Sequence, residues 1–148
     1  MAPGTTWRAA RQYLALQARL NPRAVADFDR VIEADPSAAS APAMSPPATR
    51  FGFTVGKRNA RLSVDRNLVR RVLRESARHA APALDRSAAP DQLDVVLRLK
   101  SSLPPKGSAA RVRLRADLRA EADSLLEQLM QRLASLRPAA VADRAGQA

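Results

Sequence analysis

The chain has 148 residues, a length that fits a single small domain. It holds 25 lysine and arginine residues against 14 aspartate and glutamate residues, which gives a net charge of +11, and only three of the basic residues are lysine. There is no cysteine and one histidine, which excludes a disulfide framework, a thiol nucleophile and a histidine-rich metal cluster. The excess of arginine favours a polyanionic partner, because the planar guanidinium group matches the geometry of phosphate.

The sequence does not predict a membrane or secreted protein. No apolar run approaches the length of a membrane span. The N-terminal stretch MAPGTTWRAARQYLALQARL has neither a long apolar core nor a small-residue cleavage pattern. We therefore expect a cytoplasmic protein.

The front of the chain is predicted to be helical and then irregular. Residues 1–20 are expected to form an N-terminal helical extension of the domain, with a first helix over residues 6–20 that carries large apolar side chains among alanines. A second helix begins at Asn21 and Pro22, a good N-cap and a good first helical residue, and stops at Pro36. The segment 36–49 contains four prolines among small, uncharged residues, so it is expected to be a mobile linker or an extended segment.

The rest of the chain is predicted to alternate strands and helices. Phe51, Phe53 and Val55 alternate with small residues, which is typical of a half-buried strand. The expected elements are a strand over 50–58, a helix from Ser63 or Asp65 to about His79 that ends before Pro82, and a strand over 93–99. A last helix is expected over 117–136, preceded by a short strand or lead-in at 111–115. Residues 137–148 are expected to be a flexible tail. This order predicts an α+β or α/β sandwich with a small sheet.

The segment 64-VDRNLVRRVLRES-76 is predicted to form a helix with one cationic face. At 100° per residue its basic residues and its asparagine fall within an arc of about 140°, and its apolar residues occupy the opposite arc. Between residues 50 and 79 there are nine basic residues and two acidic ones, so this part carries +7 of the net charge. A helix face that serves only solubility mixes the two signs, so the pattern favours binding of a polyanion over a merely solvated surface.

The residues of this region match a known family. The stretch 50-RFGFTVGKRNARLSVDRNLVRRVLRESAR-78 resembles the protein component of bacterial ribonuclease P, in which a strand R-x-G-F-x-V-S-K-K is followed by a helix R-N-R-x-K-R-x-x-R-E. The matching residues are Arg50, Gly52, Phe53, Val55, Lys57 and Arg58 in the strand motif, and Arg66, Asn67, Arg70, Arg71, Arg74 and Glu75 in the helix motif. The stretch 27-DFDRVIEA-34 resembles the family's first helix, and the likeness covers about residues 20–136.

The resemblance implies an α+β fold in which a small β-sheet is sandwiched with helices, ribonuclease P protein-like (ribosomal protein S5 domain 2-like), with an unusual βαβ crossover. On this basis residues 21–136 form the single domain. It also implies a subunit that assists a catalytic RNA in removing the 5′ leader of precursor tRNA. The protein, expected to be monomeric, then has no catalytic residue and no metal ligand of its own, and Mg²⁺ is held mainly by the RNA subunit.

Two groups of site residues follow from the resemblance. The catalytic RNA is expected to contact Lys57, Arg58, Arg61, Arg66, Asn67, Arg70, Arg71, Arg74 and Arg78. The single-stranded leader is expected to contact Phe28, Arg50, Gly52 and Thr54, in a cleft between the first helix and the sheet. For Phe28, a place in the hydrophobic core is an equally good interpretation.

The chain departs from the family pattern at three places. Leu68 replaces the second arginine of R-N-R, and Gly56 replaces the serine after the strand valine. The family also has an aromatic-containing strand between its first helix and the R-x-G-F strand. Here the proline-rich segment 36–49 stands in that place, so the strand is expected to be short or irregular, or the leader cleft to be partly lost.

Other functions are weaker alternatives. A noncatalytic basic RNA-binding or ribosome-associated protein could use the same helix, whereas no helix-turn-helix pair or zipper supports a DNA-binding module. The stretch 52-GFTVGKR-58 lacks the spacing and the hydroxyl residue of a phosphate-binding loop. Asp65 and Glu75 are too few and too far apart for a two-metal nuclease, and His79 is better explained by a helix C-terminus than by catalysis.

Overall fold

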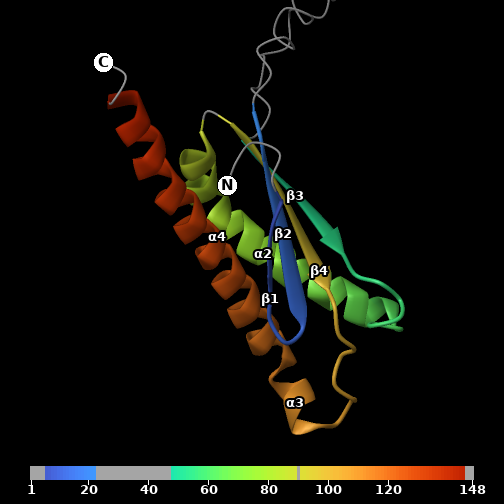
Figure 1. Cartoon of the computed structure of the whole chain (residues 1–148). Coiled ribbons are helices and arrows are strands. Elements are labelled where there is room, and N and C mark those ends of the chain that lie inside the picture. Colours follow the sequence, from blue (N-terminus) through green and yellow to red (C-terminus); the bar gives the residue numbers. More distant parts are fainter. Residues whose placement is uncertain (1–5, 23–47, 90, 146–148) are drawn as a thin grey trace, which may run out of the picture.

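The computed structural model describes residues 6–22, 48–89 and 91–145, with side chains described up to residue 136. Four strands form one mixed sheet: β1 (Thr6–Ala10), β2 (Leu14–Asn21), β3 (Thr49–Thr54) and β4 (Gln92–Leu99). Their order across the sheet is β1-β2-β4-β3, with β3 parallel to β4 and the other neighbours antiparallel. Three helices complete the described fold: α2 (Ser63–Ala88), α3 (Ala109–Val112) and α4 (Leu114–Ala145) (Figure 1). The expected α+β class with a small sheet is confirmed.

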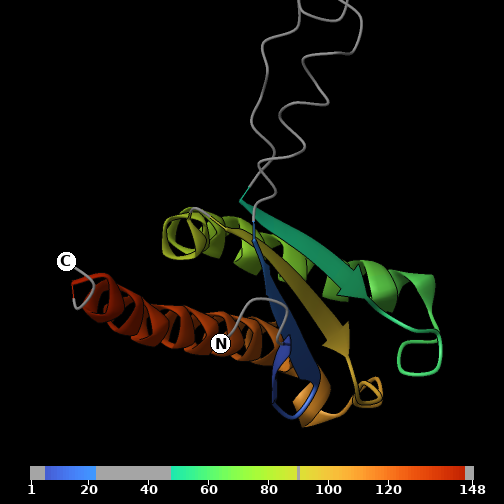
Figure 2. The same ribbon diagram turned by 45° about the horizontal axis from the view of Figure 1, so that its top comes forward.

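The sheet has one apolar face and one polar face, because side chains alternate along each strand. Leu14, Leu16 and Ala18 of β2 point to the same face as Leu93, Val95, Leu97 and Leu99 of β4, and all seven are buried. α2 and α4 pack on this apolar face and on each other, as the two views of Figures 1 and 2 show. The opposite face is not covered by any of the described helices.

The parallel strands β3 and β4 are joined through α2, which is the expected βαβ unit. The two strand predictions of the back half are confirmed, with β3 ending at Thr54 and β4 beginning at Gln92. Val69, Val72 and Leu73 place one side of α2 in the core. The basic side of α2 therefore faces outward.

The prediction of a helix over residues 6–20 is wrong. These residues form a β-hairpin, in which Trp7 pairs with Ala18 and Ala9 with Leu16. Alanine and leucine favour helices in isolation, but the alternation from Leu14 to Ala18 buries one face of a strand, and this packing decides the structure. The N-terminal part is therefore not a helical extension but half of the sheet.

The expectation of a short or irregular strand before the R-x-G-F strand concerns the segment 36–49, and the hairpin does not occupy that place. Strand β2 lies beside β4 over its full length, and it precedes the segment 23–47 in the chain. The predicted helix from Asn21 to Pro36, and nearly all of the proline-rich segment 36–49, lie outside the described residues. Asn21 itself ends β2 instead of capping a helix.

Both long helices extend beyond their predicted ends. α2 continues through Pro82 to Ala88, although proline lacks the N–H of a regular helical turn, because Leu84 and Ala88 beyond it are buried in the core. α4 continues to Ala145, so most of the expected flexible tail is helical. Residues 111–115 span the end of α3, a turn at Arg113 and the start of α4, and a strand there is excluded.

A buried ion pair links the start of α2 to α3. Arg111 donates through Nη2 to the Oδ1 atom of Asp65, and the two side chains are only 18% and 11% exposed. Asp65 also lies in the first turn of α2, where the helix dipole favours a negative charge. The pair fixes the connection before α4 against the N-terminal end of the basic helix.

Replacing Leu73, which is 0% exposed, with alanine should lower the free energy of unfolding by about 2–4 kcal/mol, because a cavity opens between α2 and the sheet. Urea denaturation measures this change. The matched control is Val64→Ala on the same helix, where the side chain is 72% exposed and the change should stay within about 0.5 kcal/mol. Equal effects at the two positions would contradict the placement of α2.

Replacing Arg111 with methionine should lower the free energy of unfolding by about 1.5–3 kcal/mol, because the carboxylate of Asp65 loses a charged hydrogen-bond partner. Arg113→Met, at an exposed position two residues away, removes the same charge and should change stability by less than about 0.5 kcal/mol. Both values come from the same denaturation series. A loss no larger at Arg111 than at Arg113 would show that the pair does not hold α3.

Candidate nucleic-acid interface

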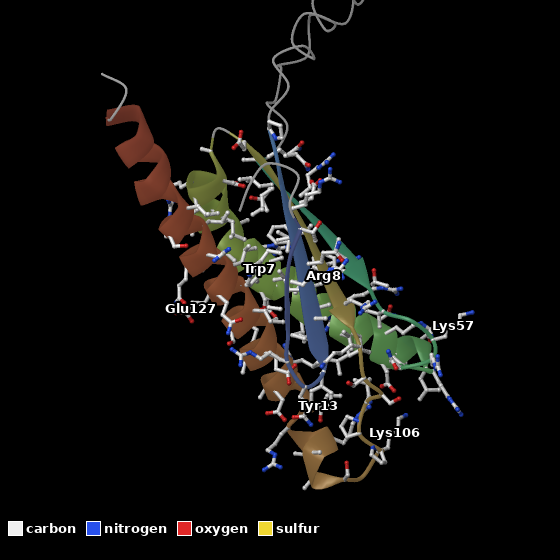
Figure 3. The ribbon with its side chains drawn as sticks, in the orientation of Figure 1. Trp7, Arg8, Tyr13, Lys57, Lys106 and Glu127 are labelled. Atoms are coloured by element: carbon white, nitrogen blue, oxygen red, sulfur yellow. The ribbon has the colours of Figure 1, made fainter. Side chains whose placement is uncertain are left out.

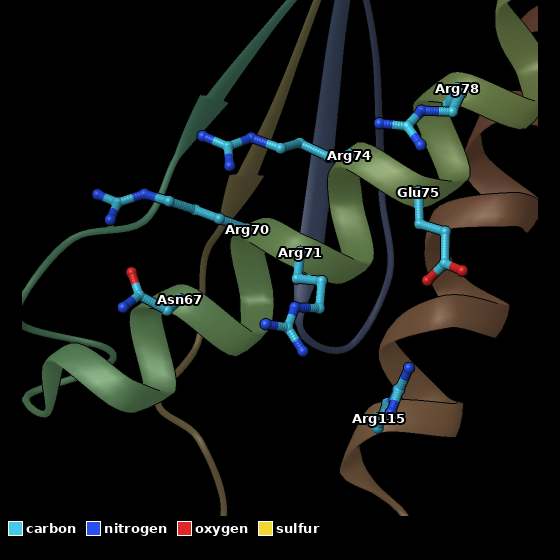
Figure 4. Close-up of a pocket in the computed structure, with 7 residues that line it drawn as sticks. All are labelled: Asn67, Arg70, Arg71, Arg74, Glu75, Arg78 and Arg115. Atoms are coloured by element: carbon cyan, nitrogen blue, oxygen red, sulfur yellow. The ribbon is translucent and has the colours of Figure 1, made fainter.

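The basic side of α2 lines an open groove of about 640 Å³. Figure 4 shows Arg70, Arg74 and Arg78 standing out from one side of α2, while Arg71 and Glu75 turn toward α4. The lining residues are Asn67, Arg70, Arg71, Arg74, Glu75, Arg78 and Arg115. Five of the nine residues expected to bind the catalytic RNA are thus brought together in one concave surface.

Arg115 is a groove residue that sequence reasoning missed. It comes from the first turn of α4, far beyond the basic motif along the chain. Nothing in its local sequence distinguishes it from the neighbouring Arg111 and Arg113. Its position depends on the packing of α4 against α2, which only the structure shows.

Glu75, the acidic residue of the groove, forms an ion pair with a residue of α4. An oxygen of Glu75 lies 3.3 Å from the guanidinium group of Arg119, which also binds Asp123 one turn further along α4 at 3.0 Å. Glu75 therefore does not need the groove arginines as partners. The charge that the groove presents to an incoming ligand is strongly positive.

Arg66 does not line the groove. Its Nη1 atom donates to the carbonyl oxygens of Ala60 and Arg61, at 3.0 and 2.8 Å, and so holds the turn between β3 and α2. This turn exposes Lys57, Arg58 and Arg61, and Figure 3 shows Lys57 standing out from it. These three predicted residues form a second basic surface beside the groove, positioned in part by Arg66.

A second anchor fixes the same turn to the end of the sheet. Asn59 donates through Nδ2 to the carbonyl oxygen of Leu99 at 3.0 Å, and its own carbonyl accepts from the N–H of Leu103 at 3.2 Å. The turn is thus held from both sides. Its cations have a fixed place relative to α2.

The open face of the sheet carries four arginines around one acid. In the strand register, Arg19 on β2 and Arg50 on β3 flank Asp94 on β4, while Arg98 lies further along β4 on the same face. Arg8 comes from β1 opposite Gln17 and is labelled in Figure 3. Of the expected leader residues, Gly52 and Thr54 lie on this face with Arg50. They leave a low, extended surface between the charged side chains.

Asp94 binds Arg50 and Asn21 directly. The Nε and Nη2 atoms of Arg50 lie 2.7 and 3.0 Å from Oδ1 and Oδ2 of Asp94, and Nδ2 of Asn21 lies 2.7 Å from Oδ2. The hydrogen bond from Arg50 lowers the pKa of the Asp94 carboxyl group, against a smaller opposing effect of partial burial. The same hydrogen bond raises the pKa of Arg50. Both groups are therefore charged at neutral pH.

The aromatic residues lie apart from these surfaces. Phe28, the expected leader contact, lies outside the described residues. The two strands of the hairpin come before Phe28 in the chain. Phe51 and Phe53 stack on each other with ring centroids 6.4 Å apart and pack against the core. His79 is exposed in the middle of α2, because the helix does not end there as predicted.

Within residues 6–22, 48–89 and 91–145, no three histidine or acidic side chains gather as ligands for a metal ion. None of the helices in the described part of the chain is long and apolar enough to cross a membrane.

The contribution of Asp94 to stability should be complete above about pH 4 and should be lost as the pH falls further. A carboxyl group with a lowered pKa in the folded state stabilises the fold above its ordinary pKa, and this contribution is lost as the pH falls through the folded-state value. The difference in the free energy of unfolding between the native protein and Asp94→Asn should therefore be constant from pH 7 to about 5 and shrink below about 4. Denaturation at a series of pH values measures it. A difference that persists at the lowest pH would mean that charge is not its source.

Comparison with known proteins agrees with this geometry. Residues 7–133 match the family model described as Ribonuclease P. The chain is 43% identical over 86 residues to the "Ribonuclease P protein component" of Bordetella avium (strain 197N), an alignment that covers 57% of this chain and 64% of that relative. No solved structure matches significantly. The family match spans most of the chain, including nearly all of the hairpin, the whole of α2 and most of α4, so the chain belongs to the family of the ribonuclease P protein component.

Proposed function

We propose that this protein is the RNA-binding subunit of a ribonuclease P, an endoribonuclease that removes the 5′ leader from precursor tRNA. In this proposal the chemistry belongs to a catalytic RNA, and the protein binds that RNA through the groove and the neighbouring turn. It acts as a monomer in the cytoplasm. The observation that carries the proposal is the groove, in which Arg115 of α4 faces the arginines of α2.

The groove suits the backbone of a folded RNA. Guanidinium groups bind phosphate oxygens through paired, charge-assisted hydrogen bonds, and contacts to phosphate fix position without reading sequence. Arginines from two helices line opposite sides of the groove, so a phosphate backbone can be held from both sides. The cations of the turn extend the same charge toward the edge of β3.

The open sheet face suits an extended, single-stranded RNA. On this face the edge strand β3 carries Gly52 and Thr54, and the inner strand β2 carries Ala15, so a chain can approach the sheet closely. The arginines can bind backbone phosphates and stack on bases. We therefore assign the 5′ leader to this face, with Arg8, Arg19 and Arg98 added to the residues expected from the sequence.

Magnesium ions for the hydrolysis are proposed to be held by RNA phosphates. The donor set of the groove does not fit a protein-bound metal, because it consists of arginines and a single carboxylate that already binds Arg119. Hard divalent cations prefer several oxygen ligands. The protein lowers the need for free magnesium by supplying positive charge of its own.

The direct test is cleavage of a precursor tRNA by a bacterial-type catalytic RNA at low magnesium concentration, with and without the protein. A large gain in rate or substrate affinity is expected. Tight binding to the catalytic RNA without any gain would support the groove and reject the leader surface. Absence of both would leave a noncatalytic RNA-binding protein as the better explanation.

Replacing Arg71 or Arg74 with alanine should weaken binding to the catalytic RNA and reduce the slope of log affinity against log salt by about 0.7–0.9 for each phosphate that the variant no longer neutralises. Arg132→Ala is the matched control, because Arg132 is exposed on α4 and does not line the groove. Filter binding between about 50 and 300 mM salt measures the slopes. Equal slopes for all three variants would place the RNA elsewhere.

A further inference from the structure

Asp94 is the one acidic side chain among the residues that the four strands direct to the open face of the sheet. It lies at the centre of that face, between Arg19 and Arg50 in the strand register. A surface built only to attract RNA gains nothing from a negative charge there. The presence of this negative charge at the centre of a basic face therefore needs a functional explanation.

The contacts of Asp94 are those that a phosphate group would make. Its two oxygens face the Nε and Nη2 atoms of Arg50 at 2.7 and 3.0 Å, the paired arrangement with which arginine binds both carboxylates and phosphates. The amide of Asn21 donates to the same carboxylate at 2.7 Å. The carboxylate of Asp94 thus occupies an anion site made by β2 and β3.

The pair is exposed enough to be exchanged. The side chain of Arg50 is 58% exposed and that of Asp94 is 31% exposed, and ion pairs in such positions are weak and screened by salt. An incoming phosphate can therefore take the place of the carboxylate on Arg50. It does so against the repulsion of the neighbouring Asp94 charge.

We propose that Asp94 is a specificity-determining residue that competes with RNA phosphates for Arg50 and thereby keeps the affinity of the sheet face for single-stranded RNA low. The inference rests on the proposed binding of the leader to this face. A cleaved leader must leave in every turnover, whereas the catalytic RNA stays bound. On the sheet face, Asp94 competes with the ligand and lowers the affinity for the leader. In the groove, the acid is paired with Arg119, so the arginines keep a high affinity for the catalytic RNA.

The test is Asp94→Asn, which keeps the shape and one acceptor oxygen but removes the charge. Affinity for a short single-stranded RNA should rise by about three- to tenfold, and the salt slope should steepen by an amount equivalent to about one additional neutralised phosphate at most. Affinity for the catalytic RNA should not change. Asp123→Asn is the control, because Asp123 is also exposed and paired with an arginine but lies on α4, so it corrects for the same change in net charge.

A double variant separates competition from other effects. In the Arg50→Gln background, Asp94→Asn should raise the affinity by a smaller factor than in the native background, since the arginine that it releases is absent and only the repulsion from Asp94 is removed. A fall in affinity for Asp94→Asn alone, similar to that for Arg50→Gln, would overturn the proposal and show that Asp94 orients Arg50 for binding. Thermal melts establish that each variant is folded.

Arg98→Gln distinguishes this inference from the proposed function. Arg98 lies on the same face and has no part in the competition. If Arg98→Gln weakens binding of single-stranded RNA while Asp94→Asn has no effect, the face binds RNA and the role of Asp94 is rejected. If neither variant nor Arg50→Gln changes binding, the leader surface itself is rejected.

Discussion

The apolar side of α2 packs against β4 and α4 through Val69, Val72 and Leu73, and this burial determines where the arginines of the helix stand. A helix of this length can turn only one side to the core, so the like charges of the other side are forced into a shared surface. α4 completes that surface because its own leucines pack on the same core. Folding of the core and formation of the basic groove are therefore one event.

The groove and the open face of the sheet both carry arginines but differ in how their acids are paired. In the groove, Glu75 is bound by Arg119 from outside the basic set, so the arginines of α2 keep their full charge. On the sheet, Asp94 is bound by Arg50 itself, so the acid reduces the charge that the face presents. The two surfaces carry similar numbers of basic residues. They differ in how much of that positive charge is neutralised by a paired acid.

Local patterns predicted the back half of the chain well. The apolar residues recur at the spacing of a strand around Phe51 and Phe53 and in 93–99, and at the spacing of a helix after Ser63. In each case the same residues form the buried face in the structure. The hairpin was missed because leucine and alanine favour a helix unless sheet neighbours are known. The length of α2 was missed because Pro82 signals an end, while the burial of Leu84 beyond it is a tertiary effect.

The candidate site was predictable to the same degree and for the same reason. Asn67 and the arginines of α2 form a local motif, and their common face follows from helical geometry. Arg115, the pairing of Asp94 with Arg50 and the hydrogen bonds of Arg66 to the preceding turn depend on contacts between distant or differently oriented elements. Such contacts leave no trace in the spacing of residues along a single chain.

The crowding of arginines along α2 also gives salt two opposite effects. In the free protein these charges repel one another across the groove, so added salt screens the repulsion and favours the folded state. In the proposed complex the same salt competes with the protein for the RNA backbone. In the proposed function, an RNA that binds the folded form replaces salt as the source of this stabilisation. The repulsion among these arginines in the free protein is thus strongest at the low ionic strength at which the proposed RNA binding is tightest.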